Sequence, residues 1–165
     1  MATEKQFEHF KYIYTQEEDR YKELISRANI FMAIATFYLG FLATNFLPTV
    51  KPSFPIALFE IIKLSLLLLG FSVFIIAFIF IIMSINIYRH EVLADPKEII
   101  ENYGDVVPKD EDFFDDRIIE FAASTIKNRT INNNRAIKLK YAAILMLIGI
   151  TLHVILLFFK ISIKK

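Results

Sequence analysis

The chain has 165 residues, of which 55% are hydrophobic, and a formal net charge of +1. This hydrophobic share is too high for an ordinary soluble domain, and the near-neutral charge argues against a dedicated nucleic-acid binder. Because the sequence has no cysteine, thiol catalysis and cysteine-ligated zinc are excluded.

The first predicted element is a charged helix near the N-terminus. Thr3-Glu-Lys-Gln6 fits a capping box, in which two side chains satisfy the first free amides of a helix. Apolar residues then recur close to a heptad spacing, and Glu17 interrupts them. They are Phe7, Phe10, Tyr14, Tyr21, Leu24 and Ala28. Such a stripe packs either against partner subunits or within the same chain, and the sequence leaves both open.

Three uncharged runs are predicted to cross a membrane as helices, because about 20 apolar residues span a bilayer. They cover residues 28–47, 64–88 and 141–159. The expected fold class is therefore all-α, an integral membrane protein with three transmembrane helices and long cytoplasmic helical extensions. We expect one helical membrane domain over residues 1–165.

The distribution of cations predicts the topology. Lysine and arginine are frequent in residues 1–27 and 89–140, whereas the link 48–63 carries only Lys51 and Lys63. The N-terminus and residues 89–140 are therefore expected in the cytoplasm, and the C-terminus outside. Three lysines close to the C-terminus leave the direction of the third span open.

The two links between the spans differ in length. The proline-rich stretch 47–55 predicts a short, stiff turn. In the longer link, Asp95-Pro-Lys-Glu98 predicts a short helix that ends near Gly104. Between residues 109 and 148 there is neither glycine nor proline. One continuous helix is therefore predicted from about Glu111 to Phe159, and about half of it would be cytoplasmic.

A polar stripe precedes the third apolar run, and its members fall on one face of this long helix. The polar stripe consists of Ser124, Asn128, Asn132 and Arg135. Asparagine both donates and accepts, so the stripe suits a bond to another helix or a polar ligand. Arg129 and Lys138 would add charge for an anionic ligand such as a phosphate. A solvated face in a chain rich in asparagine and lysine is the alternative.

Polar and small residues inside the spans are further candidates. His153 lies in the third span, where an ionisable residue often marks a pathway. It either bonds to a neighbouring helix as a neutral side chain or lines a pore with Asn45 or Thr151. The first span carries a small-residue ridge, which favours close helix approach in a homo-oligomer or between spans of one chain. The small-residue ridge consists of Thr36, Gly40 and Thr44.

No enzyme activity, cofactor or metal site is predicted. The three histidines lie far apart and lack the spacing of metal ligands. The four glycines are scattered, so no glycine-rich phosphate loop is present.

Four segments in this order resemble a known family: "RYKELISRANIFMAIATFYLGF", "INIYRHE", "YGDVV" and "KNRTINNNRAIKLKYAAILMLIGI". A charged helix leads into the first span, and a short link with an aromatic-Gly-Asp element precedes a polar helix that enters the last span. This arrangement resembles the small membrane effectors of bacterial anti-phage defence, most closely the Pycsar-type transmembrane effectors. The resemblance runs from about Arg20 to Leu157, and Arg89-His90 departs from the proline-arginine expected after the second span.

The resemblance implies an effector that oligomerises in the bacterial inner membrane and permeabilises or depolarises it when signalled, often by a cyclic nucleotide. We expect Asn128, Asn132 and Arg135 to form the switch surface for a phosphate-bearing signal, with charge from Arg129 and Lys138. The alternative is a non-gated membrane adaptor, whose cytoplasmic helices dock a soluble, for example CRISPR-associated, partner.

Overall fold

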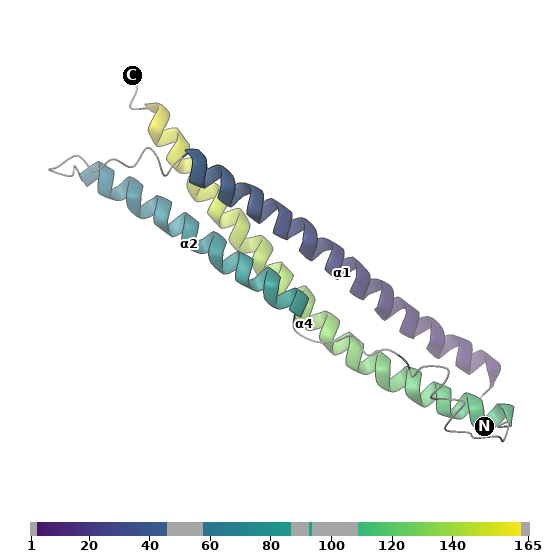
Figure 1. The fold of residues 1–165 in the computed structure, drawn as a ribbon. Helices are drawn as coiled ribbons and strands as arrows, with labels where there is room; N and C mark the ends of the chain where they lie inside the picture. The colour runs from purple at the N-terminus through teal and green to yellow at the C-terminus, as the bar shows by residue number, and fades with distance from the viewer. Residues whose placement is uncertain (1–2, 46–57, 87–92, 94–108, 163–165) are drawn as a thin grey trace. The chain divides into compact units, whose positions relative to one another are not determined.

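The structure is a computed structural model of the chain, and it describes residues 3–45, 58–86, 93 and 109–162 (Figure 1). Within these residues it contains three α-helices and no strand, which confirms the predicted all-α fold. The helices are α1 (Glu4–Asn45), α2 (Leu58–Asn86) and α4 (Asp110–Ser162). Each is long and apolar enough to cross a membrane, so the chain is compatible with a membrane location.

The ends and lengths of the helices follow the local sequence. At the start of α1, the amide of Gln6 donates to Thr3 Oγ1 at 3.4 Å, and the amide of Thr3 donates to Gln6 Oε1 at 2.9 Å. The predicted capping box is therefore present. Helix α4 runs unbroken for 53 residues, or about 80 Å at the usual helical rise. The predicted turn at 47–55 and short helix at 95–104 lie outside the described residues.

The chain forms two compact units. The charged unit contains residues 4–25 of α1 and residues 110–135 of α4. The apolar unit contains residues 26–45 of α1, all of α2 and residues 136–162 of α4. Both α1 and α4 are continuous helices that contribute to each unit.

In the charged unit, α1 and α4 run parallel. The ring of Phe7 lies 5.3 Å from that of Phe114, and the ring of Tyr14 lies 5.5 Å from that of Phe121, between centroids. Residue numbers thus rise together along both helices. Tyr14 and Leu24 are buried. The apolar stripe predicted on α1 therefore packs within its own chain here.

In the apolar unit, α2 runs antiparallel to the other two helices. Gly70 of α2 faces His153 of α4, and Phe80 contacts Tyr141 with 5.9 Å between ring centroids. Tyr38 of α1 contacts His153 at 5.6 Å between centroids. These alternating directions are the ones that three successive membrane crossings require.

The apolar unit has a filled centre and an oily exterior. Its fully buried apolar side chains are Ala35, Phe74, Ala77, Ile81 and Ala142. Large side chains such as Phe37, Leu147 and Phe158 point outward and are exposed. An exterior of this kind suits lipid rather than water, because contiguous exposed apolar surface is unfavourable in a soluble protein.

Candidate functional site

The polar stripe of α4 is buried in the charged unit. The exposed fraction is 0% for Asn128 and Asn132 and 2% for Arg135, and Ser124 is also buried. These side chains therefore do not form a solvated face. They lie on the side of α4 that packs against α1.

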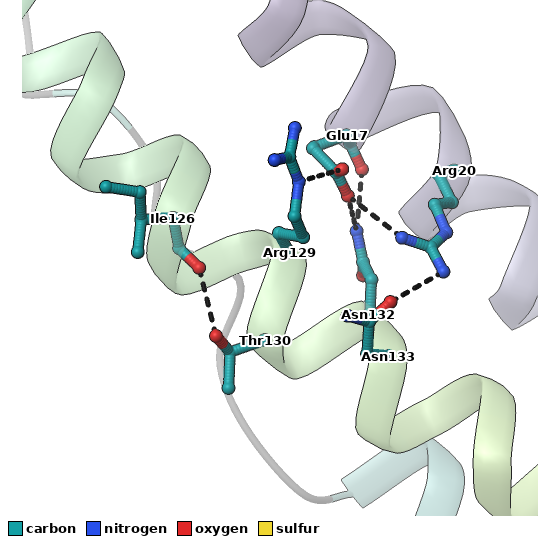
Figure 2. Close-up of polar contacts among 7 residues, drawn as sticks. All are labelled: Glu17, Arg20, Ile126, Arg129, Thr130, Asn132 and Asn133. Carbon is teal, nitrogen blue, oxygen red and sulfur yellow. Dashed lines mark hydrogen bonds and ion pairs between the residues drawn. The ribbon is translucent and has the colours of Figure 1, made fainter.

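The carboxylate of Glu17 is the acceptor on which this contact converges (Figure 2). Arg129 Nε donates to Glu17 Oε1 at 3.0 Å, and Asn132 Nδ2 donates to Oε2 at 3.1 Å. The same Nδ2 also donates to the main-chain carbonyl oxygen of Glu17 at 2.8 Å. Arg20 NH1 lies 3.5 Å from Oε2. We call these four residues, Glu17, Arg20, Arg129 and Asn132, the Glu17 cluster.

The local sequence explains why both helices supply these groups. Arg129 and Asn132 are three residues apart, so a helix places them on neighbouring positions of one face. Glu17 lies within the apolar stripe of α1. Because this stripe packs against α4, Glu17 faces α4 as well. A buried carboxylate without partners would be strongly unfavourable, so Glu17 needs the donors of α4 at this position.

These contacts control the charge of Glu17. Burial raises the pKa of its carboxyl, but the hydrogen bonds from Asn132 and Arg129 and the charge of Arg20 lower it by more. The pKa of Glu17 therefore lies below its ordinary value, and the side chain is ionised at neutral pH. The contact at Glu17 between the two helices is consequently an ionic one.

The cations of the cluster reach the surface, whereas the anion does not. The side chains of Arg20 and Arg129 are 39% and 55% exposed, and that of Glu17 is only 10% exposed. Arg20 NH2 also donates to Asn133 Oδ1 at 2.8 Å (Figure 2). The Glu17 carboxylate thus lies between the guanidinium groups of Arg129 and Arg20 (Figure 2).

Arg135 lies one helical turn beyond Asn132 and has a different environment. Its guanidinium carbon is 4.5 Å from the centroid of the Tyr21 ring, which is a cation–π contact. Burial lowers the pKa of Arg135, and Tyr21 opposes this effect. Arginine nevertheless keeps its proton in proteins. The charged unit therefore buries a second ion, on the face that also carries Asn128.

The predicted switch residues are thus separated into three groups. Arg129 and Asn132 meet at Glu17, whereas Asn128 and Arg135 are buried on the same side of α4. Lys138 belongs to the apolar unit and is half-buried there. The role of these residues in ligand binding stays a prediction.

The polar candidates of the predicted spans do not form one group either. His153 is buried, and its Nδ1 donates to the carbonyl oxygen of Gly149 at 2.8 Å. Thr151 is exposed on another face of α4, where its hydroxyl donates to the carbonyl oxygen of Leu147 at 2.8 Å. The side chain of Asn45 lies outside the described structure. The surroundings of His153 favour a packing role, and a pore-lining role stays a prediction.

The small-residue ridge is exposed on α1. A Cβ atom added at Gly40 would meet no other atom within 4 Å, whereas one at Gly70 would meet His153. The Thr44 hydroxyl donates to the carbonyl oxygen of Gly40 at 3.1 Å, so it is satisfied within its own helix. Within the described helices, the ridge at Gly40 is therefore not used for packing inside one chain.

Reasoning from the sequence identified the α4 side of this site but not its α1 side. Glu17 and Arg20 were not among the predicted site residues. The signal that points to Glu17 is its position, because it is the residue that interrupts the apolar stripe. A charged residue at a buried heptad position needs a polar partner on the facing helix.

The Glu17 cluster brings together one carboxylate, two guanidinium groups and one amide. Among the residues described, no group of three or more histidine, aspartate or glutamate side chains is placed to hold a metal ion. The Glu17 cluster offers guanidinium and amide donors to one anion. Comparison with protein-family models, curated proteins and solved structures finds no match.

Proposed function

We propose that the chain is a membrane effector of bacterial anti-phage defence, which oligomerises in the inner membrane and permeabilises or depolarises it when signalled. The observation that carries this proposal is the buried ionic contact at Glu17 between two helices that both continue into membrane-capable segments. The resemblance to small transmembrane effectors supplies the defence context.

A buried ionic contact is a poor way to stabilise two helices. Replacing such a pair by apolar side chains of similar volume is often neutral or stabilising. An apolar residue at position 17 would simply continue the stripe of α1. The ionic contact instead makes the association of α1 with α4 sensitive to competing charge, as a two-state element in a switch must be.

The apolar unit supports the assembly part of the proposal. Phe74, Ile81 and His153 fill its centre and are fully buried. Among the described helices, side chains therefore fill the centre of a single copy, so we expect conduction to require several copies. The exposed small-residue ridge at Gly40 is a surface on which a second copy can approach closely.

The proposal is tested by following membrane potential in living cells. Bacteria that express the chain are loaded with a potential-sensitive dye, with and without phage infection. We expect loss of the potential only after infection, at a constant amount of membrane-inserted protein. A potential that never changes while the protein is present in the membrane would rule the effector out.

Exposed apolar side chains on the charged unit favour the alternative, an adaptor. Ile119 and Ile126 are seven residues apart on α4, share one face and are both exposed. An adaptor would use this face to dock a soluble partner. In that case Ile119→Ser/Ile126→Ser would abolish protection against phage, although the membrane potential of the wild type never changes.

A further inference from the structure

We propose that Glu17 acts as an internal anion in a phosphate-binding site, and that a phosphate-bearing ligand separates α1 from α4 by displacing its carboxylate. The site is made of Arg129 and Asn132 of α4, and Arg20 of α1 lies at its edge. The consequence for the membrane rests on the proposed function, whereas the exchange of anions does not.

The donors around Glu17 are of the kind that binds phosphate. Arg129 Nε and Asn132 Nδ2 donate to opposite oxygens of the carboxylate, at 3.0 and 3.1 Å. Arg20 approaches less closely, at 3.5 Å, and shares its guanidinium with Asn133. Guanidinium groups bind phosphate oxygens with paired hydrogen bonds, and a phosphate offers more acceptor oxygens than a carboxylate does. A phosphate would therefore satisfy these donors at least as fully.

The positions of the charges provide a route for this exchange. The side chains of Arg129 and Arg20 are more exposed than that of Glu17, and the carboxylate lies between their guanidinium groups (Figure 2). An anion from solution meets the two guanidinium groups first. As it binds, Arg129 pairs with the anion, whereas Arg20 keeps its ion pair with Glu17 on the same helix and Glu17 regains water. No buried charge is left without a partner during the exchange.

The closed contact also carries a built-in weakness. Asn132 Oδ1 is buried and has no hydrogen-bond partner among the described residues. Separation of the helices would expose this oxygen to water and remove the free-energy cost of burying it without a hydrogen bond. The ligand must still supply the remaining free energy of separation by binding the open state more tightly than the closed one. A shift in the closed-to-open equilibrium from 1:99 to 99:1 needs about a 10,000-fold difference in affinity between the two states.

Other interactions still join α1 and α4 when the Glu17 carboxylate is neutralised. Asn132 Nδ2 also bonds to the main-chain carbonyl of Glu17, and the Phe7–Phe114 and Tyr14–Phe121 ring contacts lie elsewhere along the helices. Glu17→Gln is therefore expected to leave both helices formed. Glu17→Asp keeps the charge on a shorter side chain and serves as the conservative variant.

The experiment measures the distance between the two helices in the full chain. Because the sequence has no cysteine, Gln16→Cys and Thr130→Cys place one spin label on each helix at exposed positions. Distances are recorded by pulsed electron paramagnetic resonance in nanodiscs of phosphatidylcholine. The soluble probes are inorganic phosphate and cyclic AMP. A second set of discs contains phosphatidylglycerol, which tests a lipid headgroup as the source of the phosphate.

We expect a probe to shift the label pair to longer distances. In Glu17→Gln the concentration for half of this shift should fall about 10-fold or more, because the internal competitor is neutral. Arg129→Gln should abolish the response, and Glu17→Asp should lie near the wild type. Glu18→Gln is the matched control, because the Glu18 carboxylate pairs with Lys22 on the same helix at 2.9 Å.

The outcomes separate the sources and the claims. A shift with soluble probes in phosphatidylcholine assigns a soluble ligand, and a shift only in phosphatidylglycerol assigns a headgroup. No shift in either lipid, or equal responses of Glu17→Gln and the wild type with normal helicity by circular dichroism, overturns the proposal. If the helices separate but cells keep their membrane potential, the proposed function fails and the anion exchange stands.

Discussion

Glu17 shows how one residue determines the character of a helix contact. Its neighbours in the stripe, such as Tyr14 and Leu24, are apolar and buried, and Glu17 is buried at the same face. The hydrogen bonds from Asn132 and Arg129 and the charge of Arg20 keep it ionised there. The stability of the charged unit therefore depends on the protonation state of Glu17. An apolar residue at this position would give no such dependence.

The charged unit should accordingly weaken in acid. Because the folded pKa of Glu17 lies below its ordinary value, the unfolded chain binds more protons as the pH falls below about 4.3. The stabilisation is fully present above that pH and is lost as the pH falls through the folded pKa. We expect the midpoint temperature of thermal unfolding, measured on the full chain in nanodiscs, to be constant from about pH 7 to 5. It should fall as the pH drops below about 4.3.

Two variants identify the group responsible for this pH dependence. Glu17→Gln should remove the acid-dependent part and lower stability at pH 7 by about 1–3 kcal/mol, the usual effect of losing hydrogen bonds to a charged group. Glu18→Gln should keep the wild-type profile. An acid transition that persists unchanged in Glu17→Gln would assign it to another carboxylate.

At the scale of elements, the three helices differ in how they use their glycines. Gly70 of α2 and Gly149 of α4 receive the rings of His153 and Phe74, so a side chain at either position would collide inside the chain. Gly40 of α1 faces open space. The glycines of α2 and α4 thus allow close packing inside one chain, whereas the small-residue ridge of α1 stays exposed.

Gly40→Leu should therefore weaken self-association without unfolding the chain. The added side chain meets nothing within 4 Å in its own chain but blocks close approach of another helix. We expect a smaller mass for the detergent-extracted complex by native mass spectrometry. The matched control is Ile34→Phe, which adds bulk at an exposed position on a different face of α1. An unchanged mass in Gly40→Leu would move the interface elsewhere.

At the scale of the whole molecule, α1 and α4 link a charged unit to a membrane-capable unit through unbroken helices. Arg135 ends the charged unit on α4, and Ala136 begins the apolar unit in the next position. Helix α4 continues across this boundary, from Asp110 to Ser162. In the proposed function, a change in the association of the charged helices would reach the apolar unit through these helices.

Under the proposed function, weakening the Glu17 cluster should make the chain active without infection. Glu17→Gln shifts the equilibrium between associated and separated helices, so we expect uninfected cells that express it to lose membrane potential and grow several-fold less than the wild type. The potential-sensitive dye and colony counts measure this effect at matched amounts of inserted protein. Glu18→Gln should behave as the wild type, and equal potentials for both variants would mean that the cluster does not control the membrane segments.

The sequence by itself determined the elements of this protein. Helix bonds are local, so the capping box at Thr3 and the lack of glycine and proline from 109 to 148 were enough to predict where α1 starts and that α4 is continuous. Three uncharged runs predicted three membrane-capable helices for the same reason, because length and composition decide that property.

Only the tertiary structure decided which polar residues meet. Glu17 and Asn132 are 115 residues apart, and no local pattern pairs residues at that separation. Asn132 and Asn134 are chemically identical and two positions apart, yet the first is buried and the second exposed. The environment of a helical side chain depends on which neighbouring helix covers its face. Which helix covers a face is decided by packing over the whole contact. The partner of Glu17 therefore follows from the pairing of α1 with α4 and not from the local sequence.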